Sequence, residues 1–436
     1  MISAFSNIFK IPELKRRVLF SFAILAVYRI GCAVPIPGVD GKVIAEHFTR
    51  LQGTIFGMFS MFSGGALENG SIFSLGIMPY ISASIILQLL TVVVPYLERL
   101  SKEGEVGRRK ITQYTRYGTV VLSVFQGYMI SYGLEQGMLG AGVVPEDVKG
   151  LSFRLMGMVT LTAGTAFIMW LGEQISERGI GNGISLIIFG GIIARMPSAI
   201  ARLAMDVWQR ERKVLEIIPV MVLMVVVVGL IIFVERAQRK IQIQHAKRVV
   251  GRKIYGGANT FLPLRINTAG VIPPIFASSI LMFPTTISQF FSHPILDTVN
   301  RLFAPGALVY NLFYVGLIIF FCYFYTAVSF NPVDVADNLK KSGAYIPGRR
   351  PGKPTADYID RVLTRITFGG ALYVSAICVL PTILISKFNV PFYFGGTSLL
   401  IVVGVALDTI QQVESHMLTR HYEGFLGAKG KFKGRR

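Results

Sequence analysis

A short phrase that occurs twice constrains this chain more than any other feature of its sequence. Residues 76–87 (GIMPYISASIIL) return 194 positions later as residues 270–281 (GVIPPIFASSIL), with seven of twelve positions identical. Each copy opens a long apolar run, and these runs are the second and the seventh of ten predicted membrane spans. Because the second copy comes five spans after the first, the two cross a membrane in opposite directions. The pattern predicts an inverted repeat, which builds a passage where its two halves meet.

The composition also favours a membrane protein. The chain is 52% hydrophobic and only 16% charged, whereas about a quarter of the residues of a soluble domain are charged. A large soluble helical protein is a poor alternative, because core helices rarely run this long without charge. Charge clusters and Pro or Gly residues set the predicted spans, which are 18–36, 72–94, 117–137, 152–172, 183–201, 214–234, 269–291, 306–328, 363–385 and 397–416.

The predicted fold class is an all-α polytopic membrane protein. Its ten transmembrane helices form two five-helix inverted pseudo-repeats, arranged as a clamshell around a central pore. The predicted parts are a cytoplasmic N-tail (1–17), an N-terminal half (18–201), an external hinge (202–213), a C-terminal half (214–416) and a basic cytoplasmic C-tail (417–436).

The distribution of Lys and Arg predicts the orientation. With the N-terminus inside, the predicted cytoplasmic segments hold 32 of these residues, while the external loops and adjoining span ends hold 11. This bias places both termini in the cytoplasm.

Two cytoplasmic loops, 235–268 and 329–362, are far longer than a helix bundle needs. Attraction to anionic lipid explains the sign of their charge but not their length. A docking surface for an acidic partner, ribosomal RNA or a motor protein explains both.

Residues 55–62 form an apolar stretch that is too short to cross a bilayer, and Gly64-Gly65 interrupts it. Such a segment re-enters the membrane where protein or water surrounds it.

The middles of the spans contain almost no ionisable residues, and Arg29 is the exception, expected to snorkel or to pair locally. The sequence therefore offers no carboxylate pathway for a coupled transporter. It shows no catalytic motif, no metal-ligand spacing and no phosphate-binding loop, so it predicts no enzyme, no cofactor and no metal site.

Isoleucines recur on helical faces in both halves. Ile77 and Ile81 are one turn apart, Ile275 takes the place of Ile81 in the second copy, and Ile184 and Ile188 repeat the spacing. The alternative is that these isoleucines are ordinary packing residues that do not meet at a constriction. If the inverted halves bring them together, they form a flexible collar that closes by dewetting.

Small residues flank these faces, at 82–84 (SAS) and 277–279 (ASS). They let helices approach closely, and their hydroxyls are expected to add interhelical hydrogen bonds of about 0.5–1 kcal/mol. Helices held together this weakly can separate, although these small residues are equally consistent with permanent tight packing.

Longer motifs carry a family resemblance that runs from the first span to the last. They are MFSGGAL (61–67), GRRKITQYTRY (107–117), WLGEQI (170–175), ERGIGNG (177–183), FASSILMF (276–283), RPG (350–352) and FGGTSLLI (394–401). In these motifs the chain resembles the bacterial SecY family, the channel subunits of the Sec protein translocon.

The resemblance implies roles for particular residues. It implies a pore ring made of six isoleucines, Ile77, Ile81, Ile184, Ile188, Ile275 and Ile401. It implies a plug at about 56–68 that includes Phe59, Met61, Phe62, Gly64 and Gly65. It implies a lateral gate between spans 2–3 and 7–8, with Ser82, Gln126, Ser278, Ser279 and Phe283 along it.

The resemblance also implies partners and a location. SecA and the ribosome would dock on the cytoplasmic loops at Arg252, Lys253, Arg349 and Arg350. SecE and SecG would be the membrane partners, nascent secretory polypeptides would be the cargo, and membrane lipid would receive the released transmembrane segments. The location implied is the bacterial cytoplasmic (inner) membrane.

The expected function is a passive channel that translocates unfolded secretory polypeptides and releases transmembrane segments into lipid, driven by partner motors. The alternative is a secondary transporter or a lipid flippase with inverted repeats, and a membrane scaffold without a pore is a third class. Crosslinking of a stalled secretory chain to Ile81 or Ile275 separates them.

Overall fold

The protein was analysed as a computed structural model that describes residues 11–51, 55–137, 140, 142–208, 214–245, 248–250, 253–255, 259–290, 307–388 and 396–427. The chain divides into two compact units. The first comprises Met1–Glu211, Met282–Pro305 and Val405–Arg436, and the second comprises Arg212–Leu281 and Gly306–Gly404. The predicted boundaries of the two halves stay a prediction.

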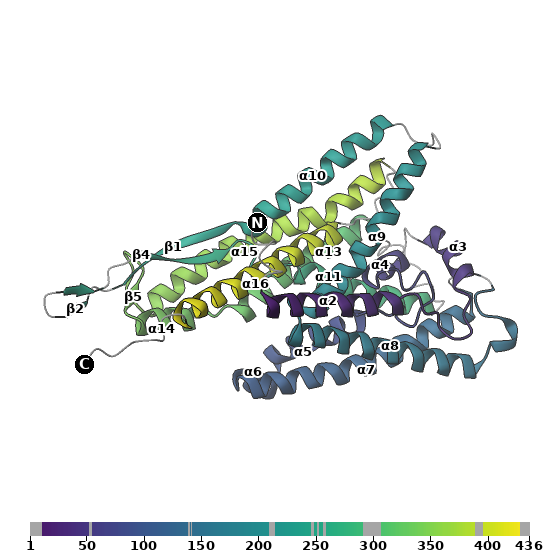
Figure 1. The fold of residues 1–436 in the computed structure, drawn as a ribbon, viewed down its shortest axis with the longest axis horizontal. Coiled ribbons are helices and arrows are strands. Elements are labelled where there is room, and N and C mark those ends of the chain that lie inside the picture. Colours follow the sequence, from purple (N-terminus) through teal and green to yellow (C-terminus); the bar gives the residue numbers. More distant parts are fainter. Residues whose placement is uncertain are drawn as a thin grey trace. The chain divides into compact units, whose positions relative to one another are not determined.

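Each of the ten predicted spans contains a helix (Figure 1). In chain order they are α2 (Pro12–Gly31), α5 (Met78–Val93), α7 (Glu105–Glu135), α8 (Leu151–Arg178), α9 (Gly183–Trp208), α10 (Val214–Arg236), α11 (Ile272–Phe290), α13 (Leu308–Ser329), α15 (Lys353–Phe388) and α16 (Gly396–Gly427). By length and composition alone, four helices of the described chain can cross a membrane. The number is five if α5 and the short helix α6 (Pro95–Lys102), which meet at 99°, count as one span.

Several helix ends differ from the prediction. α2 stops at Gly31 because Pro35 and Pro37 follow, and the residue before a proline disfavours the helical region. Residues 72–77 are not helical, so α5 begins later than the predicted span. α9 continues to Trp208, so residues 202–208 of the predicted hinge (202–213) are helical.

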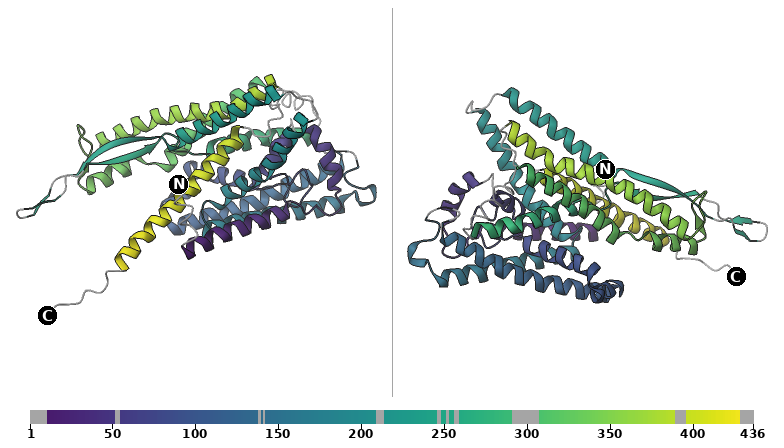
Figure 2. Two further views of the ribbon diagram at one scale, coloured as in Figure 1. Left: turned by 45° about the horizontal axis from the view of Figure 1, so that its top comes forward. Right: turned by 180° about the vertical axis from the view of Figure 1, so that it is seen from behind.

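In the first unit, α7 and α8 pack side by side along most of their length, as both views in Figure 2 show. Small side chains make this close approach possible. Thr115, Thr119, Ser123, Gly127 and Ser131 recur every four residues on the buried face of α7. α2, α5 and α9 also contact α8, so this helix holds the unit together. Two short helices, α3 (Gly41–Leu51) and α4 (Ile55–Phe62), lie between α2 and α5 in the chain.

In the second unit, the loops that were predicted without strands form a small sheet. β1 (Gln238–His245) pairs antiparallel with β4 (Asn259–Arg265) and with β5 (Ala344–Tyr345), in the order β4-β1-β5. β2 (Arg248–Val250) and β3 (Lys253–Tyr255) form a separate hairpin. The strands continue outward from the end of α10 (Figure 1).

An apolar cluster lies beneath this sheet. Ile241 and Ile243 of β1 are buried while Lys240 and Gln242 are exposed, the alternation of a strand with one covered face. The cluster joins strands β1 and β4 to the start of α15 through buried Ile241, Leu264, Ile346, Ile359 and Leu363, and α14 (Pro332–Lys341) packs against α15. The two long predicted loops are therefore one folded element.

Candidate functional site

Both copies of the repeated phrase enter their helices in the same way. Gly76 and Gly270 have φ of +56° and +62°, and each stands two residues before the helix start, at Met78 and at Ile272. Only glycine adopts this left-handed region without strain. The repeat in the sequence is thus matched by a repeat in backbone geometry.

The predicted collar residues lie in both units. Ile77 caps α5, and its carbonyl accepts the Ile81 amide at 3.1 Å, so the two are one turn apart and both are buried. Ile188 is buried and Ile184 is half-buried, on adjacent turns of α9. In the second unit, Ile275 on α11 and Ile401 on α16 are buried. That all six surround one passage stays a prediction.

The predicted plug segment consists of α4 and the turn that follows it. Phe59 and Phe62 are buried on α4 and Met61 is half-buried. Gly64 and Gly65 adopt φ of +65° and +87°, which reverses the chain directly after the helix.

Beyond the turn, an isolated antiparallel bridge between Ser71 and Pro35 joins this part of the chain to the residues that follow α2. The Ile72 amide donates to the Val34 carbonyl at 3.0 Å, and the Ile36 amide donates to the Gly70 carbonyl at 2.8 Å. These contacts involve residues that follow the predicted plug, whose bounds (56–68) stay a prediction.

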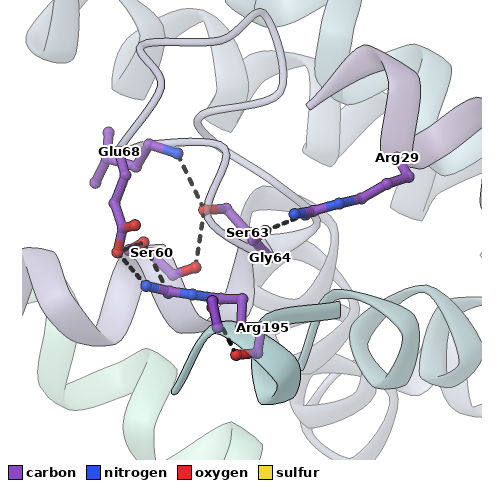
Figure 3. Close-up of polar contacts among 8 residues, drawn as sticks. Arg29, Ser60, Ser63, Gly64, Glu68 and Arg195 are labelled. Atoms are coloured by element: carbon purple, nitrogen blue, oxygen red, sulfur yellow. Dashed lines mark hydrogen bonds and ion pairs between the residues drawn. The ribbon is translucent and has the colours of Figure 1, made fainter. Parts of the chain in front are cut away.

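Two side chains of α2 hold the plug turn from one direction. Arg29 donates from Nη1 to the Gly64 carbonyl at 2.7 Å, and the Tyr28 hydroxyl donates to the Ser63 carbonyl at 3.0 Å. The expected local pairing of Arg29 is confirmed, and Figure 3 shows its guanidinium directed at the turn.

A second basic side chain holds the predicted plug from α9. Arg195 donates to the Ser60 hydroxyl at 3.0 Å and pairs with the Glu68 carboxylate, and Ser60 in turn donates to Glu68 at 3.0 Å (Figure 3). The three groups close a ring of charge-assisted hydrogen bonds, the stronger kind in proteins. No pattern in the sequence singles out Arg195, Ser60 or Glu68.

The predicted gate residues have different surroundings. Ser82 on α5 is half-buried, and Gln126 on α7 has a buried side-chain oxygen without a hydrogen-bond partner among the described residues. Ser278 and Ser279 donate to the Ile275 carbonyl of their own helix, at 2.9 and 2.8 Å. The expectation of interhelical bonds is wrong for these two serines, because a hydroxyl near the preceding turn finds a helix carbonyl first. The Phe283 side chain lies outside the described residues.

Two of the predicted docking residues, Arg349 and Arg350, lie in the turn between β5 and α15. Arg349 is exposed and stacks over Tyr358 with its guanidinium carbon 5.2 Å from the ring centroid, a cation–π contact. The Arg350 carbonyl accepts a hydrogen bond from the Thr355 hydroxyl at 2.8 Å, which fixes the turn before α15. Arg252 and the side chain of Lys253 lie outside the described residues.

The two predicted docking loops are also bonded to each other. Tyr345 donates from its hydroxyl to the Gln244 side chain at 3.1 Å, next to the pairing of β5 with β1. The sheet therefore presents basic residues of both loops from one scaffold.

Within the described part of the chain, no group of three or more His, Cys, Asp or Glu side chains could hold a metal ion. Cys32, Cys322 and Cys378 are free and buried, as expected of small core residues.

The chain matches a known family over most of its length. The model of the SecY family matches residues 71–410. The protein translocase subunit SecY of Escherichia coli (strain K12) is 53% identical over 428 residues, which cover 97% of this chain and 96% of that protein. The chain belongs to the SecY family.

Solved structures agree with this SecY membership at the level of the fold. One solved structure concerns the plug domain of the SecY protein, which stabilises the closed state of the translocation channel and maintains a membrane seal. It has a TM-score of 0.68 at 17% identity, and the match covers 93% of both chains. Sec61 in a canine ribosome–channel complex from the endoplasmic reticulum has a TM-score of 0.61 at 14% identity, with 93% of both chains covered. The chain therefore has the ten-span helical fold of multi-pass SecY membrane proteins.

Proposed function

We propose that this chain is the channel subunit of a protein translocase. It conducts unfolded secretory polypeptides across the bacterial cytoplasmic membrane and releases transmembrane segments sideways into lipid. The observation that carries this proposal is the 53% identity, over 97% of the chain, to a protein translocase subunit.

The collar and the plug support this function. The six isoleucines line the passage, where aliphatic side chains exclude water and ions yet deform around an extended chain. The plug of α4 and its glycine turn closes the resting channel, since the segment is too short to span a membrane and is held by side chains of two neighbouring helices.

Sideways release needs a seam and a driving force. The seam runs along Ser82, Gln126, Ser278, Ser279 and Phe283, and it parts at modest cost because polar side chains add only weak hydrogen bonds between membrane helices. An apolar nascent helix gains by entering lipid, with Leu, Ile, Phe and Val each contributing about 0.3–0.6 kcal/mol at the helix centre. A polar segment lacks this gain and continues through the channel.

The chain itself performs no catalysis, and partners supply the energy. The SecA ATPase and the ribosome dock on the basic sheet element through Arg252, Lys253, Arg349 and Arg350. SecE and SecG join in the membrane. The folded sheet with exposed cations supports this role, because acidic surfaces and RNA bind such a scaffold through charge.

The orientation follows the distribution of charge, with both termini and both docking loops in the cytoplasm. The excess of Lys and Arg in those segments supports this orientation.

Reconstitution tests the proposal. Vesicles that contain the chain with its two small membrane partners should translocate a secretory precursor when the motor and ATP are added, and an otherwise identical precursor without its signal sequence should stay outside. Vesicles that move neither precursor, although the complex is folded and assembled, would contradict the proposed function.

A further inference from the structure

We infer that Arg195 is a positioning residue that ties the plug to the collar through one face of α9, so that widening the collar releases the plug. The inference rests on the proposed function of the chain as a channel.

Four residues of α9 share one helical face. Ile184, Ile188, Gly191 and Arg195 are separated by four, three and four residues, the spacing that stacks side chains along one side of a helix. The first two are predicted collar residues, and the last two contact the plug. One rigid face therefore carries both.

The first plug contact is a close approach of two backbones. A Cβ atom placed on Gly191 would lie 3.0 Å from the Cα of Gly64, and one placed on Gly64 would lie 2.8 Å from the Cα of Gly191. Two glycines allow this distance, which almost any other residue would prevent. The plug turn is thus seated directly on α9, one turn beyond Ile188.

The second plug contact is the bonded ring of Arg195, Ser60 and Glu68. The side chains of Arg195 and Glu68 are 20% and 21% exposed, so water screens the pair less than it screens a surface ion pair. Arg195 joins α9 to both ends of the plug turn, because Ser60 precedes the two glycines and Glu68 follows them.

The two arginines at the plug have different roles. Arg29 and Tyr28 bond main-chain carbonyls of the turn, and they come from α2, which carries no predicted collar residue. Arg195 bonds plug side chains from the helix that carries Ile184 and Ile188. The only described proline inside α9, Pro197, lies beyond Arg195, so the helix between the collar and the plug contacts is uninterrupted. A movement of α9 that displaces the isoleucines also displaces Arg195.

Modification of the native thiol of Cys32 can show whether the plug is in place. Cys32 is 1% exposed, and its Sγ lies 3.9 Å from the Ser63 carbonyl in the plug turn. When the turn leaves, this thiol loses its cover, whereas Cys322 and Cys378 in the second unit keep theirs.

The test measures Cys32 modification and resting ion conductance in reconstituted vesicles. Arg195→Glu, which places like charges beside Glu68, should raise both by about tenfold, equivalent to about 1.4 kcal/mol. The double variant Arg195→Glu/Glu68→Arg should return both toward wild type, and Arg195→Lys should show a smaller rise because it keeps the charge. Modification of Cys322 and Cys378 should not change.

Unchanged Cys32 modification and conductance in folded Arg195→Glu would overturn the inference, as would a double variant no better than the single one. If Arg195→Glu does not fold, Ser60→Ala removes one bond of the ring and should still raise both readouts severalfold, and no rise would overturn the inference. Precursor translocation by wild-type vesicles is measured in parallel. Failure there contradicts the proposed function, whereas normal translocation with unchanged readouts contradicts only the role of Arg195.

Discussion

A single added methyl group at Gly191 should unseat the plug. In Gly191→Ala, the new Cβ would lie 3.0 Å from the Gly64 Cα and 3.3 Å from its amide nitrogen. Both are backbone atoms, which cannot turn aside as a side-chain tip can. The clash exists only while the plug is seated, so it acts on the balance between the seated and the released plug.

The size of the effect follows from the cost of overpacking. Forcing a methyl group into a packed contact costs about 1–3 kcal/mol, which shifts a two-state balance by about 5- to 150-fold. Alanine itself favours a helix over glycine by about 1 kcal/mol. A leakier channel therefore cannot be ascribed to a weaker α9.

Gly190→Ala is the matched control, one position earlier in the same helix. Its Cβ would lie 3.1 Å from Cδ2 of Leu25, the movable end of a side chain. Resting ion conductance of reconstituted vesicles should rise in Gly191→Ala and stay near wild type in Gly190→Ala. Equal conductance in the two variants and in wild type would refute the close seating of the plug on α9.

Three further predictions concern the collar and the docking element. Ile81→Gly and Ile275→Gly should each widen the collar and raise resting conductance, and conductance at the wild-type value would remove that residue from the ring. Arg350→Glu should lower motor-driven precursor translocation at least severalfold without changing the thermal unfolding of the complex. The control, Lys149→Glu on the predicted external loop, should leave translocation unchanged. Normal translocation by Arg350→Glu would argue against docking at this residue. Ile359→Ala should destabilise the sheet element by about 2–5 kcal/mol, because Ile359 is 0% exposed in its apolar cluster. Limited proteolysis should then cut the docking loops faster, and an unchanged cleavage rate would contradict the packing described.

The membrane part of the fold was predictable from the sequence, and so was its internal repeat. Long apolar runs between charge clusters predicted helices over all ten spans. The repeated phrase also predicted where equivalent backbone geometry would occur, at Gly76 and Gly270. These features are local, and each can be recognised in one stretch of sequence.

The small sheet of the second unit was missed, although the sequence carried a signal for it. Lys240, Ile241, Gln242 and Ile243 alternate polar and apolar residues, as a strand with one buried face requires. The partner strands of β1 come from two different loops, and β5 follows it by about a hundred residues. Such pairing depends on how the chain folds back, which periodicity does not reveal.

The polar ring at the plug could not be predicted for a similar reason. Arg195 reads as one more cation near the end of a span, and Glu68 as a loop carboxylate. They lie 127 residues apart in the chain. Only the packing of α4 against α9 brings them together, and a single sequence carries no record of that contact.

Site-specific photocrosslinking of an arrested precursor most directly tests whether this chain conducts protein. A photoreactive residue at position 81 or 275 should crosslink to the arrested secretory chain, while one at the exposed Phe22 of α2 should not. Crosslinks absent from positions 81 and 275 while the precursor is arrested in the membrane would contradict an isoleucine-lined passage for polypeptide.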